Sequence, residues 1–429
     1  MVTSAFVTIW GKRAGAVVWD ELKEIASFQY TKDFLKHSWN LAPLKMPLSE
    51  GTKVHQFLNL NNNETFNGLP GLLADALPDQ YGHQLINAWL IKNGRPENSM
   101  NPVEQLCFIG ERGMGALSFE PSKMPETTKN FDLEVTSLVE IAAKVLNNRQ
   151  AFHTKLKQNE QQAMQDLLKV GTSAGGARPK AIISYNKVTS EVQSGQAKAA
   201  KGFEQWLLKL DGVSDAQFGS SQGYGRIEMA YYQMAKACGI NMMESRLLEE
   251  NGRAHFMTKR FDRSPGNQKI HIQTFCALRH FDFNAVNSFS YEQLFETMRL
   301  LRLPYTQAEQ LFRRMVFNVL ARNCDDHTKN FAFSLKQNSQ WELAPAYDIC
   351  HAYRPDSLWV SQHALSINGK RKNHQREDLL AIAKSMNIKK ANQIIDFTLE
   401  IVGQWEKYAK RCGVSPKHTK AIERTFVTV

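Results

Sequence analysis

Apolar and polar residues alternate along the start of the chain, on both sides of a short turn that contains two glycines. The runs TSAFVTIW and AVVW flank the segment from Gly11 to Gly15, and a period of two predicts the two strands of a β-hairpin. A further short strand is predicted over 27–30. From Gly71 to Leu90 the apolar residues recur at helical spacing, which predicts a helix ending near residues 93–94. The opening third is therefore predicted to be a small α+β unit without catalytic residues of its own.

The pattern changes at about residue 166, where strands and loops are followed by helical stretches. Apolar runs at 181–184 and 206–210 predict strands. Helices are predicted over 134–147, 226–238, 305–323 and most of the last 50 residues. Gly239 is placed to end the helix before it, and Thr306 with Glu309 is predicted to form a capping box. Strands followed by helices are the order of a two-lobed kinase and of many other α+β proteins.

Composition shows a chain that is large enough for two or three compact units and basic overall. It has 429 residues, 42% of them apolar, and a formal charge of +11, so a sizeable core is expected. Residues 367–429 hold 13 Lys or Arg against 6 Asp or Glu, a local excess of +7. Such an excess suits a polyanionic partner, and a solvated basic surface has the same composition.

The cysteines and the hydropathy pattern favour the cytosol. Six cysteines are scattered without a CxxC pair, which favours free thiols in a reducing compartment over a zinc site. The N-terminus lacks the charged, apolar and small-residue order of a signal peptide, and no window of 18 apolar residues would span a membrane. We therefore expect a cytoplasmic protein without a membrane segment.

One segment near residue 325 has the spacing of a phosphotransfer site. Asp325 and Asn330 are five residues apart after a predicted long helix, and the chain continues FAFSLKQNSQWELAPAYDI to Asp348. The two apolar runs in this segment, 331–335 and 341–343, predict a hairpin whose ends lie side by side. Asn330 and Asp348 would therefore be neighbours in space.

Phosphoryl transfer from ATP requires such a set of side chains. One carboxylate stands by the acceptor hydroxyl, and an amide oxygen and a second carboxylate hold Mg²⁺ on the phosphates. Protein kinases present these groups in the same order along the chain, which would assign them to Asp325, Asn330 and Asp348. An Asp and an Asn at this spacing alone are more typical of an ordinary turn after a helix. The hairpin and Asp348 are what favour the catalytic interpretation.

Upstream segments offer contacts for a nucleotide. The glycine-rich run from Gly171 to Lys180 would converge backbone N–H groups on an anion, although it matches neither common phosphate-loop motif. Lys209 lies inside the apolar run WLLKL, where a lysine needs a partner unless it lies on an edge strand and points to water. Glu228 is the predicted partner, with a solvent-facing position in the first turn of its helix as the alternative.

An apolar strand around Met257 runs into a short connector at Phe261, as the segment between the two lobes of an ATP site does. Backbone groups would bind the adenine there, and either side chain would pack on it. A methionine or phenylalanine in a strand is more often simply part of the core.

Taken in order, VGTSAGGARPK, WLLKL, MTKRFDR, NCDDHTKNFAF and LAPAYDI resemble the signature set of the HipA family of bacterial serine/threonine-kinase toxins. The opening 165 residues, with LPGLLADALPDQYG, are similar to its N-terminal subdomain. The resemblance implies an α+β, bilobal protein-kinase-like fold with an N-terminal β-rich α+β subdomain and an all-α C-terminal lobe. Its parts would be 1–165 (N-terminal subdomain and connector), 166–265 (nucleotide-binding small lobe and hinge) and 266–429 (helical lobe with the catalytic loop).

The same resemblance implies an ATP- and Mg²⁺-dependent serine/threonine kinase and the role of each residue. Asp325 would be the catalytic aspartate, with Asn330 and Asp348 as the magnesium ligands and Lys209 as the nucleotide-phosphate lysine. Ser173 would be autophosphorylated, which would expel ATP because its phosphate would occupy the γ-phosphate site. The ATP-binding set would be Ser173, Ala174, Gly175, Gly176, Ala177, Lys180, Lys209, Lys259, Arg260, Phe261, His327 and Lys329.

The resemblance also implies partners. These are a HipB-like helix-turn-helix antitoxin, operator DNA that the pair would bind at the nucleoid to repress its own genes, and a protein substrate such as an aminoacyl-tRNA synthetase. Two other functions stay open: a catalytically silent corepressor, and a metal-dependent hydrolase using Asp325, Asp326 and His327. The filled metal and phosphate positions argue against the first, and the second leaves the glycine-rich run and Lys209 unexplained.

Overall fold

The computed structural model describes residues 2–123, 130–147, 158–172, 178–213 and 223–429. The chain forms two compact units, each assembled from segments that are distant in sequence. The first unit comprises residues 1–38, 49–225 and 244–271, and the second comprises 39–48, 226–243 and 272–429. The three-part division implied by the family resemblance stays a prediction.

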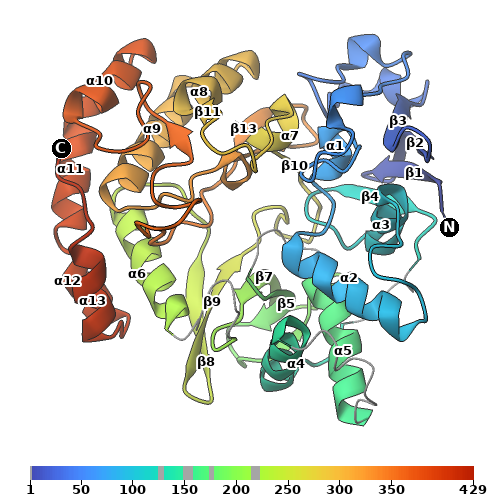
Figure 1. Ribbon diagram of the computed structural model, residues 1–429, viewed down its shortest axis with the longest axis horizontal. Helices are drawn as coiled ribbons and strands as arrows, with labels where there is room; N and C mark the ends of the chain where they lie inside the picture. The colour runs from blue at the N-terminus through green and yellow to red at the C-terminus, as the bar shows by residue number, and fades with distance from the viewer. Residues whose placement is uncertain (1, 124–129, 148–157, 173–177, 214–222) are drawn as a thin grey trace. The chain divides into compact units, whose positions relative to one another are not determined.

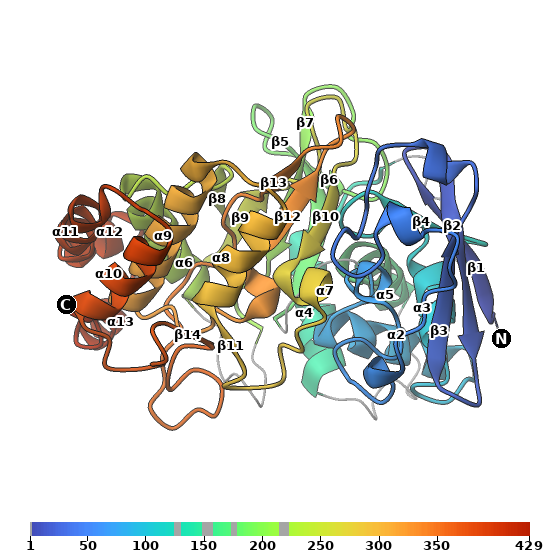
Figure 2. The same cartoon turned by 90° about the horizontal axis from the view of Figure 1, so that it is seen from above.

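A four-stranded antiparallel sheet in the order β3-β2-β1-β4 opens the first unit (Figure 2). β1 (Ser4–Ile9) and β2 (Lys12–Asp20) form the predicted hairpin, flanked by β3 (Ile25–Tyr30) and β4 (Leu117–Glu120). Helix α3 (Pro102–Ile109) contacts β1, β2 and β4. Alternate residues of β1 are buried while Phe6 is 43% exposed. The period of two in the sequence therefore marks a sheet with one buried face.

The predicted helix from residue 71 is broken into α1 (Gly71–Ala74) and α2 (Gln80–Lys92). Pro78 lies in the break, where its missing N–H and fixed φ disfavour a continuous helix. Asp79 then caps α2, because its Oδ1 accepts a 2.6 Å hydrogen bond from the Gly82 N–H. The apolar spacing concealed this break, and the Pro-Asp pair is the signal that marks it.

The first unit also contains an antiparallel five-stranded sheet in the order β6-β5-β7-β9-β8. Its strands are β5 (Lys180–Asn186), β6 (Val192–Ser194), β7 (Phe203–Lys209), β8 (Ser245–Glu250) and β9 (Arg253–Lys259). Asn251 and Gly252 join β8 to β9 with φ of 44° and 76°, the conformation that a two-residue hairpin turn favours.

Two helices, α4 (Val135–Asn147) and α5 (Gln158–Gly171), share an apolar core with this sheet (Figure 1). Ile183, Trp206 and Leu208 are among its fully buried members. The prediction that strands and loops begin at about residue 166 is wrong, because α5 continues to Gly171. Leu167 and Leu168 are buried against the core, so packing extends the helix to the edge of the glycine-rich run.

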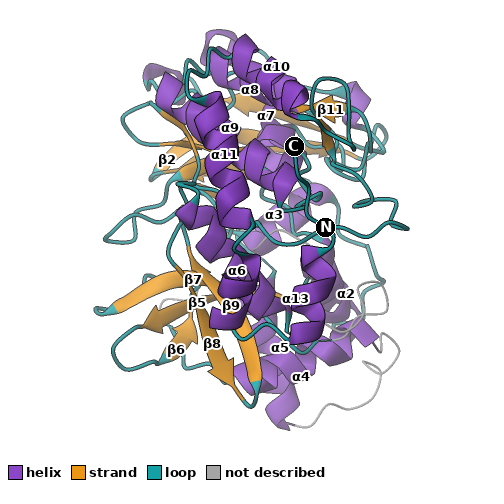
Figure 3. Ribbon diagram, turned by 90° about the vertical axis from the view of Figure 1, so that its left-hand side faces the viewer, coloured by secondary structure: helices purple, strands orange, loops and turns teal. Residues whose placement is uncertain are grey.

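The second unit is mostly helical (Figure 3). Its helices are α6 (Tyr224–Ala237), α7 (Phe275–Arg279), α8 (Tyr291–Leu300), α9 (Tyr305–Leu320), α10 (Arg376–Ser385), α11 (Ala391–Val402), α12 (Trp405–Arg411) and α13 (Pro416–Glu423). The predicted capping box at Thr306 is wrong: α9 begins directly after Pro304, which leaves Thr306 inside the first turn. Helix α9 lies in the core, where it contacts α8 and α11.

Short strands connect the helices of the second unit. β10 (His271–Thr274), β12 (Ala332–Leu335) and β13 (Trp341–Leu343) form one sheet, and β11 (Phe289–Ser290) pairs in parallel with β14 (Leu365–Ser366). β12 and β13 are the predicted antiparallel hairpin. Within the described ranges, no helix is both long and apolar enough to cross a membrane.

Candidate active site

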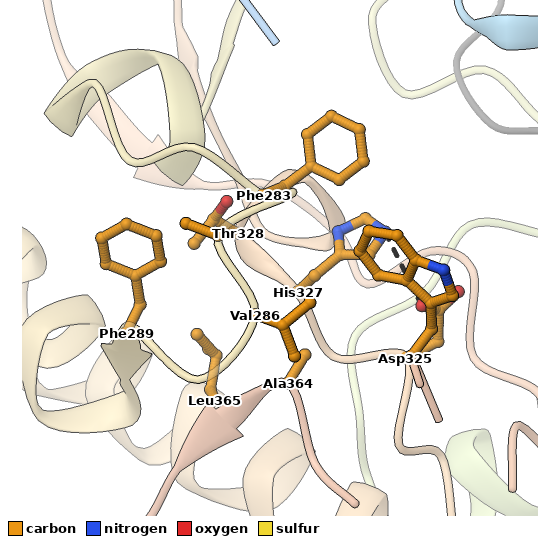
Figure 4. A pocket seen from close by; sticks show the side chains of 10 residues that line it. Phe283, Val286, Phe289, Asp325, His327, Thr328, Ala364 and Leu365 are labelled. Carbon is orange, nitrogen blue, oxygen red and sulfur yellow. Dashed lines mark ion pairs between the residues drawn. The ribbon is translucent and has the colours of Figure 1, made fainter. Parts of the chain in front are cut away.

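Two backbone hydrogen bonds hold the chain immediately before Asp325. The Cys324 N–H donates to the Ala352 carbonyl oxygen at 3.0 Å, and the Ala352 N–H donates to that of Arg322 at 3.1 Å. The loop is thereby fixed against the chain that follows Asp348. The Asp325 side chain is 45% exposed, and its Oδ1 lies 3.8 Å from His327 Nε2 (Figure 4). A partly exposed carboxylate on a fixed backbone is what a base for an acceptor hydroxyl requires.

The neighbouring Asp326 is built into the core. Its Oδ2 accepts hydrogen bonds from the Tyr291 hydroxyl at 2.8 Å and from His363 Nδ1 at 2.9 Å, and its Oδ1 accepts the Ala364 N–H at 2.8 Å. Its side chain is fully buried. Burial alone would lower the pKa of His363, but the Asp326 carboxylate, with a contribution from Cys324, raises that pKa to about 10. Asp326 and His363 therefore form a buried ion pair.

The hydrogen bonds of Asp326 argue against the metal-dependent hydrolase. A metal site made by Asp325, Asp326 and His327 needs three side chains that face one ion, whereas the Asp326 carboxylate is enclosed by its own donors. Among the residues that the structure describes, no cluster of three or more His, Cys, Asp or Glu could hold a metal. An amide and one carboxylate suit Mg²⁺, which takes its other ligands from phosphates and water.

The two ends of the β12–β13 hairpin meet, as the sequence predicts. The Tyr347 hydroxyl donates to the Lys329 carbonyl oxygen at 2.6 Å, so the residues next to Asp348 and Asn330 are in direct contact. Asn330 Nδ2 donates to the backbone oxygen of Asp325 at 2.6 Å, which turns the Asn330 amide oxygen away from that carbonyl. Asp348 has a φ of 55°, a left-handed conformation that is uncommon outside glycine and is often found at functional sites.

His327 and Lys329 shape the same loop. His327 Nδ1 accepts the Lys329 N–H at 3.2 Å and so caps the short 3-10 turn Thr328–Asn330. The Lys329 ammonium lies 4.5 Å from the centre of the Phe283 ring, a cation–π distance. These contacts are structural, and the predicted roles of both residues in ATP binding stay predictions.

In the first unit, Lys209 ends β7 directly opposite Lys180 at the start of β5. Directly opposed residues in an antiparallel pair share one face of the sheet, and like charges there repel. Lys180 is neutralised by Asp79, whose Oδ2 lies 2.9 Å from its ammonium, and their side chains are 2% and 10% exposed. The Lys209 ammonium lies 5.9 Å from the centre of the Phe256 ring.

Both ends of the glycine-rich run rest on the first turns of α2. A Cβ added at Gly171 would lie 2.8 Å from Leu85 Cδ1, and one added at Gly82 would lie 3.1 Å from the Thr172 carbonyl oxygen. Asp79 caps α2 with one oxygen and binds Lys180 with the other. Helix α2 therefore anchors the base of the predicted phosphate loop.

Replacing Asp79 with alanine is expected to lower the free energy of unfolding by about 3–5 kcal/mol, because it removes the carboxylate that neutralises a buried lysine opposite a second lysine. Urea denaturation followed by tryptophan fluorescence measures the change. Asp33→Ala is the matched control, since its 2.7 Å pair with Lys36 is 90% exposed on the carboxylate side, and no measurable change is expected there. Similar effects of the two substitutions would contradict the assignment of Asp79 as a buried anchor.

The charged side chains of the connector after β9 form ion pairs with other residues of the first unit. Lys259 Nζ lies 2.5 Å from Glu204 Oε1, and the Arg260 guanidinium binds both carboxylate oxygens of Asp262, at 2.8 and 2.5 Å. Burial would raise the pKa of Asp262, but Arg260 and Arg263 hold it well below its usual range. Contacts of Lys259, Arg260 and the half-buried Phe261 with ATP stay predictions.

Several predicted site residues cannot be placed together. Ser173, Ala174, Gly175, Gly176 and Ala177 lie outside the described residues. Lys209 belongs to the first unit, whereas Asp325, Asn330 and Asp348 belong to the second, so their convergence around one cation stays a prediction. Glu228 is buried in α6, and its pairing with Lys209 likewise stays a prediction.

Sequence reasoning did not identify the structural roles of Asp79, Asp326 and His363. The Pro-Asp pair before a helical pattern could have revealed Asp79 as an N-cap. Nothing in the sequence pairs Asp326 with His363, which lies 37 residues further along the chain. Only the tertiary structure brings these two together.

The fold and the Asp325 loop define a mixed α+β protein of the kinase-like class. Residues 172–426 match the HipA-like C-terminal domain, and residues 5–120 match the HipA N-terminal domain. The chain therefore belongs to the HipA family.

Known structures and sequences resemble this chain to different degrees. HipA of Shewanella oneidensis MR-1, solved with HipB and operator DNA, superposes with a TM-score of 0.67 and 18% identity over 98% of this chain and 94% of that one, which confirms the predicted fold. The Helicobacter pylori proinflammatory kinase CtkA aligns with 59% of this chain at 17% identity and a TM-score of 0.32, too low to bear on the fold. A Haemophilus influenzae protein named "Putative kinase" is 25% identical over an alignment of 190 positions, which covers 38% of this chain and 55% of that relative.

Proposed function

We propose that this protein is an ATP- and Mg²⁺-dependent serine/threonine kinase and the toxin of a toxin–antitoxin pair. The observation that supports the activity is the arrangement around Asp325. Its carboxylate is partly exposed, Asn330 binds its backbone oxygen, and the Tyr347–Lys329 contact brings the chain at Asp348 to the same place. These are the groups that phosphoryl transfer needs on the acceptor side and at the metal.

In the proposed reaction each residue has one task. Asp325 orients the acceptor hydroxyl and takes its proton as the oxygen–phosphorus bond forms. The Asn330 amide oxygen and the Asp348 carboxylate would hold Mg²⁺, which would neutralise charge on the β- and γ-phosphates. Lys209 would bind the α- and β-phosphates, and Asp79 would keep the adjacent Lys180 neutralised so that the loop ends stay in place.

The regulatory part of the proposal rests on Ser173 and on the relatives. Phosphorylation of Ser173 would place about two negative charges in the loop built for the ATP phosphates and so inactivate the enzyme. The Shewanella HipA structure contains HipB and operator DNA. We propose a HipB-like antitoxin and operator DNA as partners, with this chain as corepressor, and the basic excess in 367–429 predicts a salt-sensitive complex.

Incubation with labelled ATP and Mg²⁺ tests the activity, followed by mass spectrometry of the peptide that spans Gly171 to Lys180. One added phosphate on Ser173 is expected in the wild-type chain, and none in Asp325→Gln or Lys209→Ala. Lys187→Ala is a control lysine on the protein surface, where it pairs with Glu204 and Glu244, and it should leave labelling unchanged. A wild-type protein that neither binds ATP nor takes up label would instead favour a silent corepressor.

A further inference from the structure

A small apolar pocket opens directly beside Asp325 in the second unit (Figure 4). The apolar side chains of its wall include Phe283, Val286, Phe289, Trp359 and Leu365, and Asp325 and His327 lie at one side. Counted out to its open mouth, the space is about 350 Å³. That figure includes open solvent, so the enclosed part is much smaller and suits one side chain better than a nucleotide.

Two chain segments meet at the catalytic loop to build this pocket. Phe289 in β11 pairs with Leu365 in β14, and the Gln362 side-chain amide donates to Asn287 Oδ1 at 2.6 Å. The Ala364 N–H donates to Asp326. The wall is therefore tied by hydrogen bonds to the residue next to Asp325, and its position relative to the catalytic carboxylate is fixed.

The chemistry of the wall limits what can enter. Phosphate would be repelled by the Asp325 carboxylate, and an acidic side chain would meet the same charge. A basic side chain would lose water against aromatic and aliphatic walls. Trp359 is 43% exposed, so an aliphatic side chain would gain free energy by covering it.

The position of the pocket next to Asp325 indicates which substrate residue would supply that side chain. An acceptor hydroxyl must lie within hydrogen-bond reach of the Asp325 carboxylate, about 3 Å. A group that fills the adjoining pocket then belongs to a residue close to the acceptor in the same chain. We propose that this pocket selects protein substrates that carry an aliphatic side chain near the acceptor Ser or Thr, an inference that rests on the proposed kinase activity.

The predicted autophosphorylation site differs from such a substrate. Ser173 is flanked by Gly171, Thr172, Ala174 and Gly175, none of which has a large aliphatic side chain. Loss of the pocket should therefore reduce phosphorylation of foreign substrates and leave autophosphorylation almost unchanged.

The direct test uses synthetic peptides with one central serine, with leucine or aspartate placed in turn at each of the two positions on either side. At one position or more, leucine is expected to raise kcat/KM at least about tenfold over aspartate, the discrimination that a small apolar pocket gives. No preference for leucine at any position, or no peptide phosphorylation by an enzyme that still labels itself, would overturn the inference. An enzyme that does not label itself or consume ATP would instead contradict the proposed function.

Two neighbouring substitutions separate the pocket from the surface around it. Trp359→Ala is expected to reduce the leucine preference about fivefold or more by raising KM, because it removes part of the wall. Leu358→Ala is the matched control, since Leu358 is 74% exposed and does not line the pocket. Both variants should keep wild-type autophosphorylation, and equal losses of the leucine preference in the two would contradict the role of the pocket.

Discussion

The Asp325→Asn variant is expected to lose phosphoryl transfer by about 10²–10⁴-fold while it keeps the wild-type fold. The substitution removes the proton acceptor from the acceptor hydroxyl, and general-base catalysis is worth that factor. It preserves the size of the side chain. Because this side chain is 45% exposed, a neutral amide there costs little stability. Single-turnover transfer of labelled phosphate measures the rate, and nucleotide titration checks that ATP still binds.

An exposed carboxylate further along the same part of the chain provides the control. Asp356 lies in the segment that follows Asp348 and is exposed, so Asp356→Asn changes charge equally and should leave the rate unchanged. Retention of transfer within a few-fold of wild type in Asp325→Asn would remove Asp325 from the mechanism. Loss of ATP binding in the same variant would show that the carboxylate serves the nucleotide rather than the acceptor.

The Asp326→Ala variant is expected to lower the free energy of unfolding by about 3–5 kcal/mol. The substitution leaves three hydrogen-bond donors without their acceptor, from Tyr291, His363 and Ala364. Breaking a buried charge pair has this cost because the remaining charge must be desolvated without compensation. Urea denaturation measures the loss, and Asp325→Ala is the matched control, for which only a small change is expected.

The pH dependence of stability gives a second readout of this pair. The pKa of His363 is about 10 in the folded protein and about 6.5 in an unfolded chain. A pKa that is raised by folding stabilises the protein fully below the unfolded value and loses that contribution as pH rises through the folded value. Stability should therefore fall between about pH 7 and pH 10 in the wild type and more gently in Asp326→Ala. Parallel pH profiles would contradict the pair.

Asp325 and Asp326 are adjacent in the sequence, yet their side chains have different roles. Asp325 is partly exposed on the loop, whereas Asp326 is buried and holds the segment that carries His363 and Ala364. The first is expected to affect rate without stability, and the second stability first and rate as a consequence. The sequence places two aspartates side by side and cannot distinguish them.

Local pattern was sufficient wherever neighbouring residues determine the conformation. The hairpins β1–β2 and β12–β13 follow from alternation around short turns, and most of the helices follow from apolar spacing. The approach of the chain at Asp348 to the chain at Asn330 follows from the hairpin between them. Such contacts span few residues, so the sequence pattern constrains them directly.

The apolar pattern was misleading at three places, two of them next to a proline and one where packing with distant residues decided the outcome. Pro78 with the Asp79 cap divided a continuous apolar pattern, packing extended α5 to Gly171, and Thr306 was left inside α9 rather than at its cap.

By itself, the sequence determined the family, the fold class and the residues proposed for phosphoryl transfer, because these depend on motifs and short-range spacing. Only the tertiary structure decided that Lys180 pairs with Asp79, 101 residues away, and that Asp326 pairs with His363. A buried charge takes its partner from whichever segment the core brings beside it, and that choice is made by packing across the whole unit.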